Sequence, residues 1–121
     1  MSLKALVVDD DTVNRKLLSS ILKKKGIEVL EASNGAEAIK YLSHGVDIIL
    51  LDIIMPIMNG IDFIGVVRGD EDYKNIPILV LTTDDTKKQE ALAAGANDFI
   101  IKPISPVALL EKIEQYTSKK E

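Results

Sequence analysis

Four short apolar runs of the chain each end in a polar side chain of a kind that binds phosphate or a cation. The runs cover residues 6–8, 48–51, 78–81 and 99–101, and they are followed by Asp9, Asp52, Thr82 and Lys102. Short apolar runs of this kind are typical of parallel strands that are covered on both faces. Parallel strands of one sheet end at a common edge, where open α/β sheets bind their ligands. The pattern therefore predicts one pocket that holds carboxylates, a hydroxyl group and an ammonium group.

Length and composition narrow the class of protein. The 121 residues suit one domain, 1–121, and the 46% hydrophobic and 28% charged residues are ordinary for a globular chain. The absence of cysteine excludes disulfides and thiolate metal sites and fits a reducing compartment. No apolar run approaches the roughly 20 residues of a membrane span. The net charge of −4 argues against direct binding of nucleic acid. We expect a cytoplasmic protein with no membrane or nucleic-acid partner.

Strand-like and helix-like segments alternate along the whole chain. Strands are predicted at 3–8, 27–31, 46–51, 78–81 and 98–101, and helical segments at 12–25, 34–42, 61–68, 84–94 and 105–116. Thr12 and Ser105 are predicted N-caps, with Pro106 at the first helical position. Asp11 is expected to be only an acid of the first helical turn.

Five βα units without a linker or repeat predict an α/β fold. Right-handed crossovers give a flavodoxin-like, doubly wound (βα)5 domain with a parallel five-stranded sheet in the order 2-1-3-4-5. The first and third strands are then neighbours at the point where the strand order reverses. Asp9, Asp10 and Asp52 end these two strands, so the three acids are expected to lie together.

Such a group of acids needs a compensating charge. Two carboxylates ~4 Å apart repel each other by about 4 kcal/mol at an effective dielectric constant near 20. A protonated acid or a hard divalent cation would relieve this repulsion, and oxygen ligands without histidine or cysteine favour Mg²⁺ or Mn²⁺. Lys102 adds an ammonium group and Thr82 a hydroxyl donor. Transfer of a phosphoryl group onto an aspartate requires these groups.

Five dispersed motifs carry a family resemblance that covers essentially the whole chain. They are Val8-Asp9-Asp10; Leu51-Asp52 with Met55-Pro56 and Asn59-Gly60; Leu81-Thr82; Gly95-Ala96; and Lys102-Pro103. In order and spacing the chain resembles the receiver domain of two-component response regulators, of the single-domain chemotaxis type. The resemblance implies a phosphorelay switch and not a turnover enzyme.

The resemblance also implies a role for each site residue. Asp52 would accept a phosphoryl group from the phosphohistidine of a histidine kinase or phosphotransfer protein. Asp10, Asp52 and the backbone carbonyl of Ile54 would bind Mg²⁺ directly, and Asp9 would act mainly through a bound water molecule. Lys102 would pair first with Asp52 and then with the phosphoryl group.

The remaining implications concern the switch. Thr82 would move toward the phosphoryl oxygens, and Phe99 would pack into the space that Thr82 leaves. This change would remodel the surface of the fourth helix, fifth strand and fifth helix, where a downstream protein or a second receiver would dock. The Lys102-Pro103 peptide bond is expected to be cis. We also hypothesise that the aliphatic Ile54 shields the acyl phosphate from water, so that Ile54→Asn would speed autodephosphorylation.

Two alternatives stay open from the sequence. A haloacid-dehalogenase-like phosphatase would use Asp9 as the nucleophile and Asp11 as the acid, with Thr82 and Lys102 in supporting roles. No acidic pair follows Lys102, and the chain is short for that family. A receiver-like docking module that is never phosphorylated would not bind Mg²⁺. The single histidine, His44, is expected to be a solvated residue at a helix end.

Overall fold

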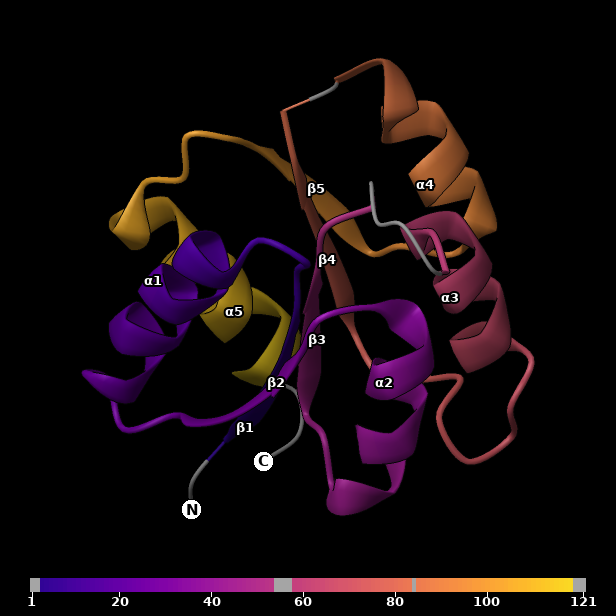
Figure 1. Cartoon of the computed structure of the whole chain (residues 1–121), viewed down its shortest axis with the longest axis horizontal. Helices are drawn as coiled ribbons and strands as arrows, with labels where there is room; N and C mark the ends of the chain where they lie inside the picture. The colour runs from indigo at the N-terminus through magenta and orange to yellow at the C-terminus, as the bar shows by residue number, and fades with distance from the viewer. Residues whose placement is uncertain (1–2, 54–57, 84, 119–121) are drawn as a thin grey trace.

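The computed structural model describes residues 3–53, 58–83 and 85–118. These residues form a parallel five-stranded sheet with helices on both faces, in the strand order β2-β1-β3-β4-β5 (Figure 1). The strands are β1 Lys4–Val8, β2 Glu28–Ala32, β3 Ile48–Leu51, β4 Ile78–Thr82 and β5 Asp98–Ile101. The predicted fold class and strand order are therefore confirmed.

Five α-helices of the described residues cover the sheet. They are α1 Thr12–Lys23, α2 Gly35–Tyr41, α3 Gly60–Arg68, α4 Lys88–Ala94 and α5 Pro106–Thr117, with short 3₁₀ turns at Leu42–His44 and Asp85–Lys87. Helices α1 and α5 lie on one face of the sheet, and α2, α3 and α4 lie on the other (Figure 1). The predicted fourth helix is thus a 3₁₀ turn followed by a shorter α-helix, and its expected first residue, Asp84, lies outside the described residues.

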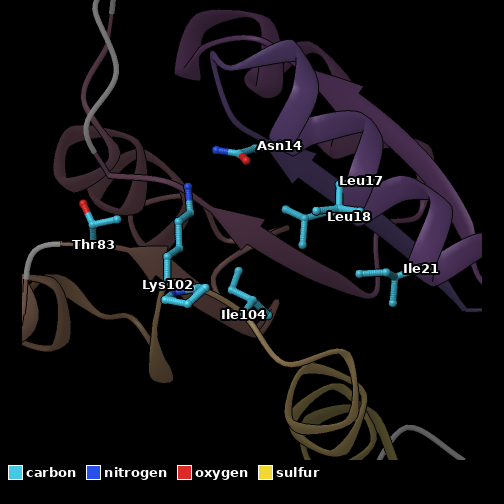
Figure 2. A pocket seen from close by; sticks show the side chains of 8 residues that line it. Asn14, Leu17, Leu18, Ile21, Thr83, Lys102 and Ile104 are labelled. Atoms are coloured by element: carbon cyan, nitrogen blue, oxygen red, sulfur yellow. The ribbon is translucent and has the colours of Figure 1, made fainter.

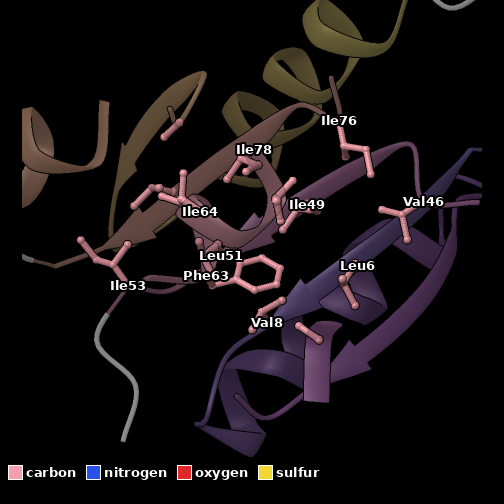
Figure 3. Packing of buried hydrophobic residues seen from close by; sticks show 14 of the residues in the cluster. Leu6, Val8, Val46, Ile49, Leu51, Ile53, Phe63, Ile64, Ile76 and Ile78 are labelled. Carbon is pink, nitrogen blue, oxygen red and sulfur yellow. The ribbon is translucent and has the colours of Figure 1, made fainter. Parts of the chain in front are cut away.

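The alternation of side chains along the strands divides the core into two layers. Leu6, Ile49 and Val80 face α2, α3 and α4, while Val7, Leu50 and Leu81 face α1 and α5. Figure 3 shows the first layer, where the fully buried ring of Phe63 lies close to Leu51 and Val8. All four residues of β3 are buried, because this central strand is covered on both faces. The coverage of β3 on both faces explains the continuous apolar run in the sequence.

The start of α1 differs from the prediction by one residue. The N-cap is Asp11, whose side chain accepts hydrogen bonds from the backbone N–H groups of Val13 and Asn14, and Thr12 is already helical. A carboxylate in this position satisfies two free N–H groups and also interacts favourably with the positive end of the helix dipole. The prediction of Ser105 as the N-cap of α5, with Pro106 at its first position, is confirmed.

Arg68, the last residue of α3, joins the loops at the N-terminal ends of β4 and β5. Its guanidinium group donates to the carbonyl oxygens of Lys74, Ile76 and Gly95 and to the side-chain oxygen of Asn97, at 2.8–3.0 Å. This network lies at the end of the sheet opposite to the acidic residues. None of the helices in the described ranges has both the length and the hydropathy of a membrane-spanning segment.

Candidate functional site

The acids predicted to form a pocket come together where β1 and β3 end. The two strands are paired in parallel with Val8 opposite Leu51, and the backbone N–H of Asp52 donates to the carbonyl oxygen of Val8 at 2.9 Å. One carboxylate oxygen from each of Asp9, Asp10 and Asp52 lies within 4.8 Å of the others. Asp9 is buried, Asp52 is half-buried and Asp10 is exposed, so the group opens to solvent on one side.

Lys102 reaches this group from the end of β5. Its Nζ lies 3.3 Å from Oδ2 of Asp9 and 3.4 Å from Oδ2 of Asp52, and its side chain is only 15% exposed. The backbone N–H of Lys102 donates to the carbonyl oxygen of Thr82 at 2.9 Å, which continues the pairing of β4 and β5 to the site. The Lys102-Pro103 peptide bond is cis, as the resemblance implied.

Burial dominates the electrostatics of Asp9. It raises the pKa of the Asp9 carboxyl above its usual value, and the charge of Asp52 acts in the same direction. The backbone N–H of Asp11 and the ammonium group of Lys102 lower this pKa, but they do not cancel the effect of burial. The surroundings of Asp9 therefore disfavour its charged form, and a cation bound beside it would stabilise that form.

Asp9 and Asp10 lie in a turn whose backbone is held by further hydrogen bonds. The Asp11 N–H donates to Oδ1 of Asp9 at 2.9 Å, and Nη1 of Arg15 donates to the backbone oxygen of Asp9 at 2.8 Å. Nε of Arg15 in turn donates to Oε1 of Glu31 at 3.1 Å. The sequence reasoning did not identify Arg15 or Glu31, because a long side chain that bonds to a backbone carbonyl leaves no pattern in the sequence.

The expected switch residues lie on neighbouring strands. Thr82 is buried at the end of β4, and Phe99 on β5 is half-buried against the core layer of α2, α3 and α4. Val80 lies opposite Phe99, and Ile101 lies opposite Thr82. The two side chains are therefore diagonal neighbours on one face of the sheet. Ile54, the expected carbonyl ligand, lies outside the described residues.

A groove of about 440 Å³ runs from Lys102 toward α1. Figure 2 shows Leu17, Leu18 and Ile21 of α1 on one side of it and Thr83, Lys102 and Ile104 on the other. The groove is mostly apolar, but the ammonium group of Lys102 connects it to the acids. It gives the site a neighbouring surface that a larger partner can contact.

The donor set of the acidic group fits a hard divalent cation. Three carboxylates face a single ammonium group, and the oxygen atoms that lie close together come from two adjacent strand ends. Mg²⁺ binds to one or two carboxylates together with water and phosphate oxygens, and it does not require nitrogen or sulfur ligands. Asp9, Asp10 and Asp52 are therefore the described residues that could hold such an ion.

Comparison with known families agrees with this arrangement. The sequence profile of the response regulator receiver domain matches residues 5–114. The chain belongs to this family. It is a receiver domain of two-component signalling, a class of signalling proteins and not of classical enzymes. The comparisons lend no support to the phosphatase alternative.

Curated relatives of the receiver domain include separate chemotaxis proteins and part of a kinase. The chain is 42% identical over 117 residues to the chemotaxis protein CheY1 of Helicobacter pylori, which covers 93% of this chain and 94% of that one. It is 40% identical to a segment of the autoinducer sensor kinase/phosphatase CqsS of Vibrio cholerae, which covers 91% of this chain and 17% of the larger protein. The family thus includes both separate chains and domains of longer proteins.

Solved structures of receivers have the same fold. The chemotaxis protein CheY4 of Vibrio cholerae superposes with a TM-score of 0.89 at 39% identity and covers 96% of this chain and 99% of its own. The receiver domain of a Pseudomonas aeruginosa sensor histidine kinase superposes with a TM-score of 0.90 at 25% identity, over 98% of this chain and 99% of its own. That structure has a magnesium ion coordinated in its active-site cleft.

Proposed function

We propose that this receiver accepts a phosphoryl group on Asp52 from a histidine kinase or phosphotransfer protein, in a reaction that depends on Mg²⁺. The observation that carries the proposal is the position of the Lys102 ammonium group, 3.4 Å from Asp52 and 3.3 Å from Asp9 within a group of three carboxylates. This arrangement can stabilise the negative charge of a phosphoryl group in transfer.

Accessibility supports Asp52 as the acceptor in preference to Asp9. The Asp52 side chain is 14% exposed and that of Asp9 is 2% exposed, so of these two carboxylates Asp52 is the more accessible to a bulky phosphoryl donor. An Asp52 oxygen attacks the phosphorus of the donor phosphohistidine. The new P–O bond forms as the P–N bond breaks, and the imidazole nitrogen keeps the electron pair of the broken bond and takes a proton from solvent.

The expected metal ligands are Asp10, Asp52 and the backbone carbonyl of Ile54, with Asp9 acting through a water molecule. When bound, Mg²⁺ would neutralise charge on the phosphoryl oxygens, and Mn²⁺ offers similar chemistry. The grouping of Asp9, Asp10 and Asp52 supports this assignment. The magnesium ion in the related Pseudomonas receiver supports it further.

Phosphorylation would then change the shape of the molecule. A phosphoryl group adds roughly −1.5 to −2 charge and new acceptor oxygens. Lys102 and the Thr82 hydroxyl would turn toward these oxygens, and Phe99 would move into the space that Thr82 leaves. Phe99 is half-buried on the same sheet face as Thr82, which supports this coupling. The change would shift the population of the α4-β5-α5 surface toward the form that binds a downstream protein or a second receiver.

The apolar groove beside Lys102 supports a docking position for the donor. Val13 and Leu17 of α1 are 74% and 59% exposed, and Val107 of α5 is 68% exposed. We infer that the partner carrying the phosphohistidine contacts the surface around Leu17, because the groove that Leu17 lines leads to Lys102. Docking there would bring the phosphoryl group to Asp52.

Labelling with acetyl phosphate in the presence and absence of Mg²⁺ tests the proposal. The wild-type chain is expected to gain one phosphoryl group only with Mg²⁺, and Asp52→Asn is expected to abolish the labelling. Borohydride reduction followed by peptide mass spectrometry should place the modification on Asp52. Labelling that survives in Asp52→Asn and is lost only in Asp9→Asn would support the phosphatase alternative. A wild-type chain that does not bind Mg²⁺ would indicate a docking module.

A further inference from the structure

Arg15 of α1 is fixed beside the acidic turn by two directed hydrogen bonds. Its Nη1 donates to the backbone oxygen of Asp9 at 2.8 Å, and its Nε donates to Oε1 of Glu31 at 3.1 Å. The Arg15 and Glu31 side chains are 15% and 18% exposed. Glu31 also pairs with Lys16, whose side chain is 65% exposed. Arg15 thus links α1, the end of β1 and the neighbouring strand β2.

The hydrogen bond from Arg15 constrains the peptide group that joins Asp9 to Asp10. The Asp9 N–H donates to the carbonyl oxygen of Ala32, and Oδ1 of Asp9 accepts from the Asp11 N–H. The hydrogen bond from Arg15 to the Asp9 carbonyl oxygen constrains the orientation of the peptide plane that joins Asp9 to Asp10. Because a peptide group is planar, this orientation fixes the N–Cα bond of Asp10, and the hydrogen bond from the Asp11 N–H to Oδ1 of Asp9 holds the peptide group that follows. Asp10 is exposed, so burial does not hold its side chain in place.

We propose that Arg15, oriented by Glu31, is a positioning residue for the divalent-cation site. It holds the Asp9–Asp10 peptide so that the carboxylates of both acids stay within reach of Asp52. Mg²⁺ requires nearly ideal octahedral geometry, so its affinity depends on how well the ligands are oriented in advance. This inference rests on the proposed function, because it concerns the same Mg²⁺ site.

Electrostatics and positioning predict opposite effects when Arg15 is replaced. Loss of a positive charge near three carboxylates makes the site more negative, which alone would strengthen cation binding. Loss of the hydrogen bond to Asp9 frees the peptide that carries Asp10, which would weaken cation binding. The direction of the change in Mg²⁺ affinity therefore separates the two effects.

The test compares Arg15→Gln with Lys16→Gln. Both variants remove one positive charge and one partner of Glu31, but Lys16 has no hydrogen bond to Asp9 among those of the described residues. Isothermal titration calorimetry with Mg²⁺ alone gives the affinity, and urea unfolding without Mg²⁺ gives the stability of each variant. Arg15→Gln is expected to bind Mg²⁺ about 10-fold more weakly than the wild type. Lys16→Gln is expected to bind it as tightly or slightly more tightly.

Each other outcome has a separate meaning. An Arg15→Gln variant that is less stable but binds Mg²⁺ as tightly as the wild type would show a purely structural role and overturn the inference alone. A wild-type chain that binds no Mg²⁺ would overturn the proposed function and this inference together. If Arg15→Gln does not fold, Arg15→Lys tests the inference instead, because one amine cannot reproduce both guanidinium contacts. Its Mg²⁺ affinity should fall by a smaller factor, and wild-type affinity would overturn the inference.

Discussion

The Nζ atom of Lys102 and the Oδ2 atom of Asp52 lie 3.4 Å apart, although fifty positions separate the two residues in the sequence. The contact arises because β4 pairs with β3 on one side and with β5 on the other, so all three strands end at the same edge. Lys102 also lies 3.3 Å from Asp9, at the end of the next strand along the sheet. One ammonium group thus balances part of the charge of two carboxylates.

Replacing Lys102 with methionine should separate phosphoryl transfer from metal binding. The change keeps most of the side-chain volume and removes the charge that would stabilise the transferring phosphoryl group. Loss of one such group typically slows a reaction by roughly 10²-fold or more, so labelling by acetyl phosphate should slow by about 100-fold. Mg²⁺ affinity should not fall, because a competing cation has been removed. A rate of labelling close to that of the wild type would contradict the role given to Lys102.

Asp9→Asn should stabilise the chain at neutral pH when Mg²⁺ is absent. Burial raises the folded-state pKa of Asp9. The contribution of this raised pKa to the free energy of unfolding is therefore present at low pH and is lost as the pH rises through the folded-state pKa. Asparagine removes this cost, and we expect a gain of about 1 kcal/mol in the free energy of unfolding at pH 7. The gain should disappear below pH of about 4, where the carboxyl group is protonated in both states.

Urea unfolding at both pH values, with EDTA, measures the effect of Asp9→Asn. Saturating Mg²⁺ provides the control, because a ligand that binds only the folded state stabilises it. With Mg²⁺ the free energy of unfolding of the wild type should rise relative to that of the variant. An Asp9→Asn variant that is less stable than the wild type at pH 7 in EDTA would contradict the prediction.

Asp98→Asn should have the opposite effect on stability at neutral pH. Burial raises the pKa of Asp98, but hydrogen bonds from Lys112, the Phe99 N–H and Tyr116 together outweigh it and lower the pKa below its usual value. The stabilisation is therefore present above the unfolded-state pKa and is lost as the pH falls through the folded-state pKa. We expect the variant to lose about 1 kcal/mol at pH 7 and to approach the wild type below pH of about 3. A constant difference in unfolding free energy between pH 3 and pH 7 would count against this assignment.

Two glycine-to-alanine substitutions should change stability in opposite directions. Gly95 has a φ of +123°, and a Cβ atom there would lie 2.8 Å from Cγ of Arg68, whose guanidinium group bonds to the Gly95 carbonyl. Gly95→Ala should therefore destabilise the fold by about 2 kcal/mol. Gly65 lies within α3, where a Cβ atom would meet no atom of the other described residues within 4 Å beyond the backbone of its own helix, so Gly65→Ala should stabilise the fold by up to about 1 kcal/mol. Thermal unfolding of the two variants measures both effects, and equal shifts in Tm would contradict the prediction.

The strands and the acidic pocket could be predicted because their signals are local in the sequence. An apolar run such as residues 48–51 identifies a doubly covered strand, and the polar residue after it marks the end of that strand. Once the runs are taken as parallel strands, the convergence of Asp9, Asp52 and Lys102 follows from topology alone. Helix boundaries were less accurate. Asp11 replaced Thr12 as the N-cap because both side chains can accept the same hydrogen bonds.

The contacts that orient the side chains of the pocket could not be predicted from local sequence signals. Arg15 bonds to the Asp9 carbonyl and Arg68 to the Ile76 and Gly95 carbonyls, and a backbone carbonyl has the same chemistry at every residue. A long, flexible side chain can reach many such acceptors, so the partner it finds depends on how helices pack on the sheet. The residue types of the site were therefore apparent in the amino-acid order, whereas the groups that hold them in place were apparent only after the chain had folded.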